Sequence, residues 1–539
     1  AAGVEPAGIG GLLKVGVENC VVTDLDITAL NDQAVSDGNV TGFLGAWANG
    51  NLPYKGNVIV SGNITTVSGN GTVANRISYQ DTNKSENYCG PEALINGEQQ
   101  TGGAPDNAIG GDATAEQLQD KTFWENLGFD FESVFAWDEE TGTIALQKAD
   151  MTVVPPDETE SPVTLEKDEE GYWLIKTAED FAQIELEPAG KFRLNNDLDL
   201  AGQSLEPIAY FSGELDGQNY AITGLTVDAK GDSYAIFGAL NSGGIIHDLK
   251  LSDVSIENGG GSYTAPLVGS CSGTVEKVTV TGVVQGGDQT GGIVGNVQGT
   301  GVVRQCSAGV EVAGSSRVGG IAGQVTGTVE ACYINADVSG ENNVGGVTGY
   351  GLDNAGGSRM IRNCIAEGSV SCTGVEAGGI AGLAKVNIQN NIVRRMDAST
   401  TGTGNPGDGN VASLLGAWMN NVSGQKLTIS HNVILSGSVS APEPADGYRL
   451  GVMNNPDYVH DNYANADILV NGQTVTGVHN DGNGADLTQE QMSDRAFFEE
   501  LGFDFESVFE WNEGGNTIAL RGVDMSVTPP APEVDASAT

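Results

Sequence analysis

Four histidines, His247, His431, His460 and His479, are the first residues to consider for metal or acid–base chemistry. A zinc site of the metalloprotease type needs two histidines on one helical face, as in the pattern His-Glu-x-x-His. The chain has no such pattern, and no two of its histidines lie at a spacing that metal ligation uses. We therefore expect each histidine to be a surface or loop residue, and the sequence predicts no metal-binding residue.

Carboxylates offer a second kind of chemistry, because enzymes that cleave glycans use several Asp or Glu, with a base or a second carboxylate nearby. Charged side chains recur at one repeated position of this chain, occupied in turn by Glu276, Arg304, Glu330 and Arg362. Their signs alternate, so that successive repeats would bring opposite charges together. The pattern predicts neighbouring ion pairs, and we expect no catalytic residue and no enzyme.

An acidic loop, Asp481–Asp486, leaves calcium as the one cofactor to consider. The loop lacks the glutamate that completes an EF-hand, and the matching segment of the first half, Gly110–Ala113, does not preserve its pattern. A helix N-cap for the segment after Leu487 is therefore the role that we expect for Asp486. The sequence predicts no cofactor-binding residue.

Seven cysteines are present, without a CxxC pair or a cluster of cysteine with histidine. Cys306, Cys332 and Cys364 fall at one position of successive repeats, where Val278 stands one repeat earlier. This placement predicts a ladder of small, buried, free thiols rather than disulfides or redox chemistry. The motifs of serine hydrolases (GxSxG) and of phosphate-binding loops (GxxxxGK[ST]) are both absent.

The elements that would position any site are defined by a recurring glycine phrase, Gly-Gly-Ile/Val-x-Gly. Its second glycines recur at a near-constant interval, as Gly292, Gly320, Gly346 and Gly379, and a Val/Ile-rich run follows each phrase. An interval of this size indicates stacked repeats, because a single unit cannot bury its own apolar face. We expect the glycines to supply unusual backbone angles and close contact between coils. The predicted fold is mainly β: a right-handed parallel β-helix with small helical caps, in tandem modules.

A larger repeat becomes visible when the two ends of the chain are compared. Val4–Val15 matches Val375–Val386, and the match continues at the same offset as far as Trp47 and Trp418. Further on, Phe123–Trp137 matches Phe497–Trp511 and differs from it only at Trp124, Asn126 and Ala136. We therefore expect the chain to begin inside one module and to contain a whole second module, as a fragment of a longer tandem array.

The domain boundaries follow from this duplication. We expect a short helix with Thr177 as its N-cap to cover the opening end of the second module. An aromatic-rich C-terminal cap would protect the other end of each solenoid. The expected parts are the C-terminal portion of a first β-helix (1–112), its cap (113–153), an acidic proline-containing linker (154–165), a second β-helix (166–486), its cap (487–527) and a flexible tail (528–539).

The charge of the chain excludes several functions. Lys and Arg number 24 and Asp and Glu number 71, for a formal net charge of −47. A surface of this sign repels phosphate backbones and anionic lipids, so we expect neither nucleic-acid binding nor membrane association. No apolar run approaches the length of a transmembrane helix, and we expect no membrane insertion.

The glycine phrases resemble those of bacterial proteins that carry the GLUG motif. Gly213–Leu225, Thr177–Ala182 and the closing Phe497–Phe505 also fit this resemblance, which covers nearly the whole chain. It implies a secreted or surface-attached repeat protein with a parallel β-helix, and no catalytic residue. Some such proteins form the non-catalytic part of surface peptidases that cleave immunoglobulin A. The acidic residues of the opening coils, Asp197, Asp199 and Asp216, belong to the structural phrases under this resemblance.

These patterns predict a non-catalytic module of a large bacterial secreted or cell-surface repeat protein, acting as a stalk, an adhesin or an extracellular structural element. Its expected partners are neighbouring modules and a glycan or protein of a host or cell surface. Loops that differ between modules are the expected binding sites, namely 32–39, 70–83, 400–410 and 442–457. The alternatives are a β-helix polysaccharide lyase or hydrolase and an accessory region of a surface peptidase.

Overall fold

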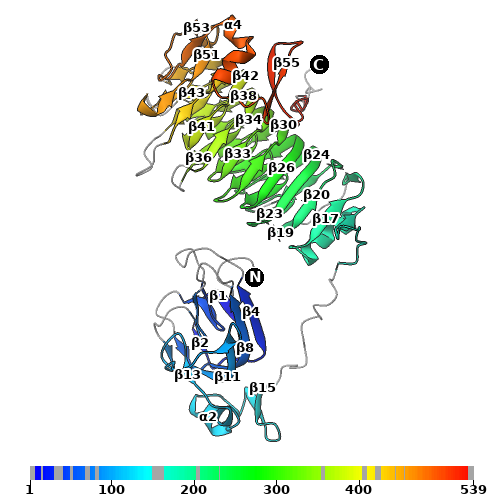
Figure 1. Ribbon diagram of the computed structural model, residues 1–539, viewed down its shortest axis with the longest axis vertical. Helices are drawn as coiled ribbons and strands as arrows, with labels where there is room; N and C mark the ends of the chain where they lie inside the picture. The colour runs from blue at the N-terminus through cyan, green and yellow to red at the C-terminus, as the bar shows by residue number, and fades with distance from the viewer. Residues whose placement is uncertain are drawn as a thin grey trace. The chain divides into compact units, whose positions relative to one another are not determined.

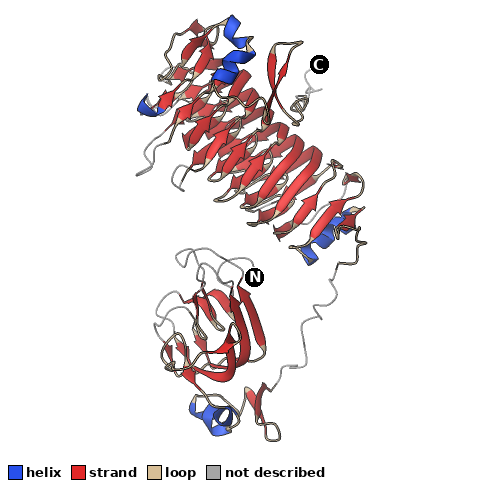
Figure 2. Cartoon of the chain, viewed as in Figure 1, coloured by secondary structure: helices blue, strands red, loops and turns tan. Residues whose placement is uncertain are grey.

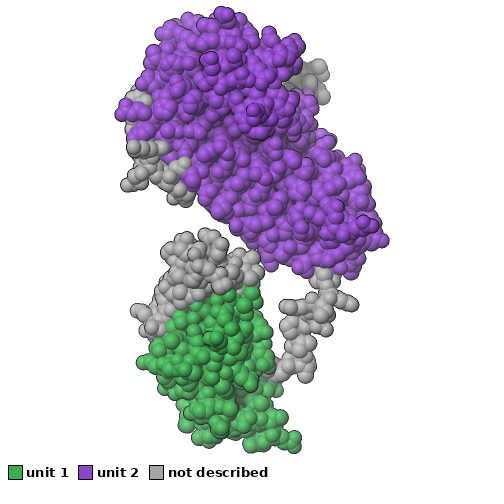
Figure 3. Space-filling model, in the orientation of Figure 1, with its two compact units in different colours: residues 1–158 green, residues 159–539 purple. Residues whose placement is uncertain are grey.

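The computed structural model describes residues 7–13, 16–29, 40–48, 53–66, 73–78, 84–147, 163–201, 207–229, 231–353, 358–402, 410–418, 427–442, 445–453 and 456–531. The chain divides into two compact units, residues 1–158 and 159–539, called unit 1 and unit 2 below (Figure 3). Strands dominate both units, and the helices are few and short (Figure 2). Most of the linker and of the tail expected from the sequence lies outside the described residues. Among the described helices, none has the length and apolarity that a membrane crossing requires.

Unit 2 is built from stacked coils, each with up to four short strands that pair in parallel with those of the next coil (Figure 1). One complete coil consists of β31 (Ser316–Gly319), β32 (Ala322–Val325), β33 (Thr328–Glu330) and β34 (Tyr333–Gly340). Equivalent residues of successive coils lie directly over one another. Inward-facing Val, Ile, Leu and Cys side chains therefore form one continuous core along the stack. The expected fold class, a mainly β parallel solenoid, is confirmed.

The strands of unit 2 form three sheets. The smallest contains β27 (Thr290–Gly291), β31, β35 (Asn342–Gly345), β39 (Ala377–Gly378), β43 (Val411–Ala412) and β48 (Gly447–Tyr448). The second contains β19 (Ile208–Phe211), β23 (Phe237–Leu240), β25 (Val268–Cys271), β28 (Val294–Val297), β32, β36 (Thr348–Leu352), β40 (Ala381–Lys385), β44 (Leu415–Trp418) and β49 (Val452–Met453).

The third and largest sheet bends around a corner in most coils. Before the corner it contains β16 (Trp173–Ile175), β17 (Lys191–Leu194), β20 (Glu214–Asp216), β29 (Val302–Arg304), β33, β37 (Met360–Arg362), β41 (Asn387–Gln389), β45 (Ile429–Ser430) and β50 (Val459–His460). After the corner it contains β18 (Leu198–Asp199), β21 (Ala221–Thr223), β22 (Thr226–Ala229), β30 (Ser307–Ala313), β34, β38 (Ile365–Cys372), β42 (Ile392–Thr400), β46 (Val433–Ile434), β47 (Gly437–Ser440), β51 (Tyr463–Asn465), β52 (Leu469–Val470), β53 (Gln473–Thr474) and β54 (Ala485–Leu487). Two long strands, β24 (Ile245–Asn258) and β26 (Thr274–Gln285), pass through the corner.

From the coil of β24 onward, a single residue in the left-handed region makes the corner between the two parts of this sheet. These corner residues have φ between 50° and 58°; they are Asp248, Lys277, Gln305, Ala331, Asn363, Asn390, His431 and Asp461. The residue that follows the corner points into the core and is buried in every coil; these are Leu249, Val278, Cys306, Cys332, Cys364, Asn391, Asn432 and Asn462. The expected ladder of buried free cysteines is confirmed.

The corner ladder continues from cysteine into asparagine, which the sequence analysis missed. Asn391 Nδ2 donates to Asn432 Oδ1 at 3.0 Å, and Asn432 Nδ2 donates to Asn462 Oδ1 at 2.9 Å. Each amide also bonds to backbone of a neighbouring coil, so these buried polar groups are satisfied. Unit 1 repeats the device, because Asn57 Nδ2 donates to Asn87 Oδ1 at 2.8 Å.

The glycine phrases lie between the smallest and the second sheet, and their role differs in part from the expectation. None of the four second glycines has a φ in the left-handed region, so unusual backbone angles are not the reason for them. Close contact between coils is the reason. A Cβ atom on Gly292 would lie 2.1 Å from the carbonyl oxygen of Gly320, and one on Gly320 would lie 2.4 Å from that of Gly346.

At the opening end of unit 2, the helix α3 (Ala178–Ala182) forms where it was expected. The Thr177 hydroxyl accepts from the Asp180 amide and the Asp180 carboxylate accepts in return, which makes a capping box. Its buried Phe181 joins the solenoid core. A 3-10 helix, η2 (Gln183–Leu186), follows it directly.

The aromatic C-terminal segment of unit 2 does not only close the end of the stack, as the term cap implied. It consists of α4 (Gln489–Met492), α5 (Arg495–Glu500), β55 (Phe509–Asn512) and β56 (Thr517–Leu520), and it is preceded by η3 (Pro456–Tyr458) in the last coils. It runs back along one side of the solenoid and buries a row of outward-facing residues, which we call the flank row: Tyr333, Ile365, Ile392, Val433 and Tyr463. We call residues 488–528 the flank clamp.

Unit 1 contains fewer described coils with the same plan. Its solenoid strands are β1 (Gly10–Leu13), β2 (Val17–Glu18), β3 (Val21–Val22), β4 (Leu25–Ala29), β5 (Val40–Thr41), β6 (Gly45–Ala48), β7 (Tyr54–Lys55), β8 (Val58–Thr66), β9 (Val73–Ala74), β10 (Lys84–Ser85), β11 (Tyr88–Ile95), β12 (Glu98–Gln99) and β13 (Gly111–Asp112). Its clamp consists of α1 (Ala115–Leu118), α2 (Lys121–Asn126), β14 (Phe135–Asp138) and β15 (Thr143–Leu146).

The corner geometry makes a prediction about Ala331, which has φ of 52° and no polar side chain to offset the strain. The substitution Ala331→Gly should raise the free energy of unfolding by about 0.5–1 kcal/mol, because glycine adopts this conformation without a steric penalty. Ala308, which is buried in β30, is the matched control. Ala308→Gly should lower stability, because it removes a packed methyl group without relieving strain. Urea denaturation of the full chain measures both changes, and equal losses for the two variants would contradict the corner interpretation.

Candidate functional site

A row of mostly charged side chains runs along the largest sheet. In the regular coils each member stands one residue before the corner residue, and so two residues before the buried residue that follows the corner. Backbone pairing brings its members into direct register from coil to coil: Arg193, Asp216, His247, Glu276, Arg304, Glu330, Arg362, Gln389, Ser430 and His460. We call this row the charge ladder. Paired positions of parallel strands are about 4.8 Å apart, so that each side chain must tolerate the charge of its neighbours.

The regular part of the ladder carries the ion pairs that the sequence predicts. Arg304 Nη2 lies 2.5 Å from Glu276 Oε2, and Arg362 Nη2 lies 2.6 Å from Glu330 Oε2. The two arginines are 44% exposed, so that water screens these pairs and their individual contributions to stability are small.

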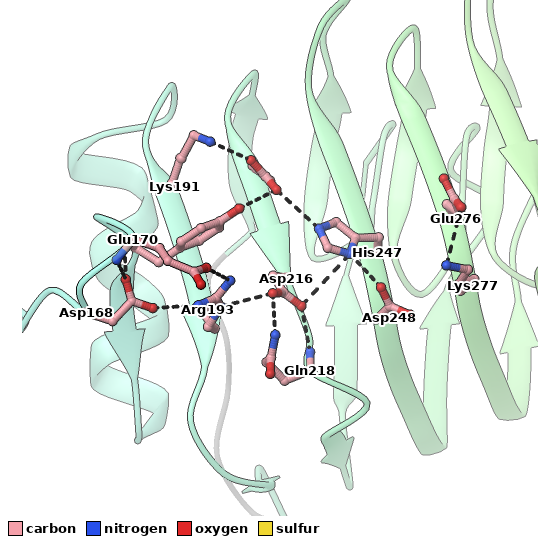
Figure 4. A network of polar contacts seen from close by, with 12 residues as sticks. Asp168, Glu170, Lys191, Arg193, Asp216, Gln218, His247, Asp248, Glu276 and Lys277 are labelled. Atoms are coloured by element: carbon pink, nitrogen blue, oxygen red, sulfur yellow. Dashed lines mark hydrogen bonds and ion pairs between the residues drawn. The ribbon is translucent and has the colours of Figure 1, made fainter.

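At the opening coils the ladder gathers into a denser network, shown in Figure 4. Arg193, from β17, bonds to three carboxylates: Nη1 lies 2.6 Å from Asp168, Nη2 lies 2.9 Å from Glu170, and Nε lies 3.0 Å from Asp216. The Asp216 side chain is only 6% exposed and also accepts from the amide and the side chain of Gln218. Arg193 is therefore the cation that compensates the buried carboxylate of Asp216.

Glu214 forms the second centre of the network. It accepts a hydrogen bond of 2.5 Å from the Tyr172 hydroxyl, and Lys191 Nζ lies 3.0 Å from its other oxygen. His247 Nε2 lies 3.4 Å from Glu214, while His247 Nδ1 lies 2.7 Å from Asp248. Lys191 from β17, Glu214 from β20 and His247 from β24 thus lie on one face, and Tyr172, the residue before β16, joins them there.

His247 corrects the expectation that every histidine is a surface or loop residue. It lies near the start of strand β24 and its side chain is 22% exposed. Asp216, His247 and Asp248 also form the one group of metal-ligating type found among the described residues, with ligand atoms within 4.8 Å of one another. Both oxygens of Asp216 already accept hydrogen bonds, from Arg193 and Gln218, and these bonds would compete with a metal ion.

The network shifts the pKa values of several of its members. Burial alone would raise the pKa of Glu214, but hydrogen bonds from Tyr172 and Lys191 lower it overall. Burial likewise opposes ionisation of Asp168, yet backbone amides and Arg193 hold the pKa of its carboxyl below the usual value. Burial and the bond to Glu214 raise the pKa of Tyr172 to about 12. The carboxyl groups of Glu214 and Asp168 are thus kept ionised and the phenol is kept neutral.

This arrangement constrains what the network can do chemically. A general acid needs a carboxyl group whose pKa is raised, and a general base needs a free lone pair near the substrate. The two carboxylates with shifted pKa values move in the opposite direction. Four carboxylates of the network, those of Asp168, Glu170, Glu214 and Asp216, each pair with Arg193 or Lys191, so the arrangement suits stabilisation of the coil stack.

The other acidic residues singled out from the sequence bond to nearby backbone. Asp197 accepts from the amide of Ala221 in the next coil, and Asp199 accepts from the amide of Ala201. Asp481 accepts from three amides of its own loop, those of Val478, Asn483 and Gly484.

The expectation that Asp486 caps the following helix is wrong. Thr488 is the N-cap of α4, and Asp486 lies 2.6 Å from Arg449, whose side chain is fully buried. Unit 1 preserves this pair as Arg76 and Asp112, also at 2.6 Å. In both units the guanidinium group of a buried arginine therefore already pairs with the carboxylate at this acidic position.

The remaining histidines lie outside the network. His431 is a corner residue and lies 3.6 Å from Asp461, and the ring of His479 packs edge-on against Tyr463 at 4.9 Å. His460 is an exposed member of the charge ladder. The variable loops expected to bind partners, at 32–39, 70–83, 400–410 and 442–457, lie wholly or in part outside the described residues.

The sequence analysis missed Arg193, Tyr172, Glu214 and Asp248. A signal for part of the network was present, because Asp216, His247 and Glu276 each follow an apolar residue that stands at the same place in its repeat. Extending the alignment of Glu276 backward would have placed Arg193 and His247 in the ladder. The contacts of Tyr172 and Asp168 could not be predicted from the repeat pattern, because these two residues reach the ladder from outside the regular coils.

Comparisons with known proteins find few relatives. No protein-family model matches the chain. A stretch of 139 residues, 23% of this chain, is 31% identical to halomucin of Haloquadratum walsbyi, and it spans 2% of the length of that protein. Among solved structures, a candidate immunoglobulin A1 protease from Bacteroides ovatus is similar over 66% of this chain and 94% of its own, with 18% identity and a TM-score of 0.38.

Arg193 and Arg304 occupy the same ladder position in different surroundings, which allows a matched test. Arg193→Met leaves the buried Asp216 without its cation and should lower the free energy of unfolding by about 2–3 kcal/mol. Arg304→Met breaks an exposed pair and should cost less than about 1 kcal/mol. Calorimetry of the full chain measures both losses of stability. Equal losses would show that the opening network contributes no more to stability than the exposed pair of Arg304.

The lowered pKa values make a second prediction, about acid. Because folding lowers the pKa of Glu214 and Asp168, protonation favours the unfolded chain. The stabilisation is present above their unfolded pKa values of about 4 and is lost as the pH falls through the folded values. The melting temperature should therefore fall in acid, and the fall should be shallower in Glu214→Gln. An unchanged slope in that variant would contradict the assignment.

Proposed function

We propose that this chain is a non-catalytic part of a large secreted or cell-surface repeat protein, in which it serves as a stalk, an adhesin or another extracellular structural element. The observation that carries the proposal is the duplication of one construction plan. Both units combine a parallel solenoid, a corner ladder, a buried arginine paired with an aspartate, and an aromatic flank clamp. A chain that repeats a whole folding unit gains length and repeated surface.

The charge of the chain supports the same proposal. A formal net charge of −47 keeps a repeat protein soluble and discourages association between copies through like-charge repulsion. Cationic groups and uncharged glycans remain as suitable partners for such a surface. The similarity to halomucin, of which the matched stretch is 2%, is in keeping with a module of a very large protein.

A glycan lyase or hydrolase is the second candidate, and the network around Glu214 and His247 is the observation that favours it. Several carboxylates, a histidine and an arginine lie together on one face of the opening coils. The saturation of these groups by one another favours the structural role over this alternative.

Two measurements on the native protein test the proposal. Protease treatment of intact source cells should release peptides of this chain while a cytoplasmic marker stays intact, and release only after lysis would contradict a surface location. Incubation of the purified chain with neutral and acidic polysaccharides should produce no new reducing ends and no unsaturated uronates. Turnover that is lost in both Glu214→Gln and His247→Ala would establish the enzyme instead.

A further inference from the structure

A cleft of about 250 Å³ lies where the flank clamp of unit 2 meets the charge ladder, and we call it the corner cleft. The ladder residues Arg304, Glu330 and Arg362 line it, together with Ser507 and Val508 of the clamp. These ladder residues belong to three successive coils that pair in register. Pockets for drug-sized ligands measure roughly 300–1,000 Å³, so the corner cleft suits a smaller unit, of the size of one sugar ring.

Three corner residues, Gln305, Ala331 and Asn363, also line the cleft, and the middle one is unusual. Among the corner residues of the described coils, Ala331 alone has no polar side chain. Its φ of 52° suits asparagine or glycine better than alanine. A residue held in an unfavourable backbone conformation points to a local requirement. Here the short side chain of Ala331 leaves space between the two longer side chains of Gln305 and Asn363.

Packing against the clamp does not by itself account for this alanine. Ala331 is partly buried against the apolar cluster of the clamp. Asn390, another corner residue at the clamp, nevertheless keeps a full polar side chain, whose Nδ2 donates to the carbonyl of Leu501 at 3.2 Å. A polar corner residue is therefore compatible with a clamp beside it, and the space at Ala331 needs a further reason.

The ladder offers hydrogen-bonding groups to this space without an unpaired charge. Arg304 donates from Nε and Nη2 to Glu276, at 2.9 and 2.5 Å, and Arg362 donates from the same atoms to Glu330 Oε2, at 2.9 and 2.6 Å. Among the described residues, Nη1 of neither arginine has a hydrogen-bond partner, so this group can donate to a ligand. Glu330 Oε1 can accept in turn.

We propose that the corner cleft binds one neutral sugar unit of a glycan. Guanidinium and amide N–H groups donate to sugar hydroxyls, and carboxylate and amide oxygens accept from them. Since a glutamate already neutralises each cleft arginine, the ligand needs no charge, and a chain with a net charge of −47 repels acidic polymers. The cleft supplies a ligand for the adhesin role and rests on that part of the proposed function, whereas a surface location and a structural role do not require it.

Saturation-transfer NMR on the full chain tests the cleft with methyl glycosides of glucose, galactose, mannose and N-acetylglucosamine. At least one of them should bind, with a dissociation constant of about 1 mM, because a small ligand in a single cleft gains little free energy. The substitution Ala331→Asn fills the space and should weaken this binding by about tenfold or more. It should not lower the melting temperature, because Asn363 adopts the same backbone conformation one coil later.

Two further variants keep the test decisive. Ala331→Gly leaves the space open and should bind the glycoside as the unmodified chain does. Arg304→Met removes a donor whose ion pair is exposed, and it should weaken binding by about threefold or more, even if Ala331→Asn proves unstable.

Three results would overturn the corner cleft: no glycoside binds, Ala331→Asn and Arg304→Met both bind as tightly as the unmodified chain, or methyl glucuronide binds more tightly than every neutral glycoside. If protease still releases the chain from intact cells in any of these cases, the proposed function stands without this ligand. Binding by a chain that protease releases only after lysis would instead overturn the surface location.

Discussion

Parallel stacking in register is the constraint on which the rest of the structure depends. Each residue lies directly over its equivalent in the next coil, so a side chain is acceptable only if it tolerates a similar one about 4.8 Å away. Valine, isoleucine and cysteine meet this condition by packing. Asparagine meets it because its amide donates to one neighbour and accepts from the other, as in the row from Asn391 to Asn462. Arginine and glutamate meet the same condition by alternating from coil to coil, so that opposite charges are neighbours.

In the opening coils the charge ladder no longer alternates regularly between positive and negative side chains. Between Asp216 and Glu276 the ladder holds His247, and two more carboxylates, Glu214 and Asp248, lie beside it. Arg193 and Lys191 offset this concentration of negative charge from one side. The opening coils therefore hold a dense network of paired polar groups at one end of the stack. This arrangement accounts for a compact polar network without requiring a substrate.

The flank clamp adds a second constraint, which acts across coils rather than between neighbours. Aromatic residues are scarce in the solenoid and concentrated in the clamp, where Phe498, Phe503 and Phe509 form edge-on and tilted contacts. Because one clamp contacts several coils, it ties together repeats that otherwise touch only their immediate neighbours.

The sequence by itself determined the repeat, the fold class, the cysteine ladder and the ion pairs of Glu276 with Arg304 and Glu330 with Arg362, because stacking in register turns sequence period into spatial contact. It also determined that the module is duplicated. Only the tertiary structure decided that unusual backbone angles are not the reason for the second glycines of the phrases, that Asp486 binds Arg449, and that the aromatic segment lies along the flank. Those outcomes, like the gathering of Tyr172 and Asp168 around Arg193, depend on contacts between segments that share no period. A periodic pattern carries no information about such contacts until the chain has folded.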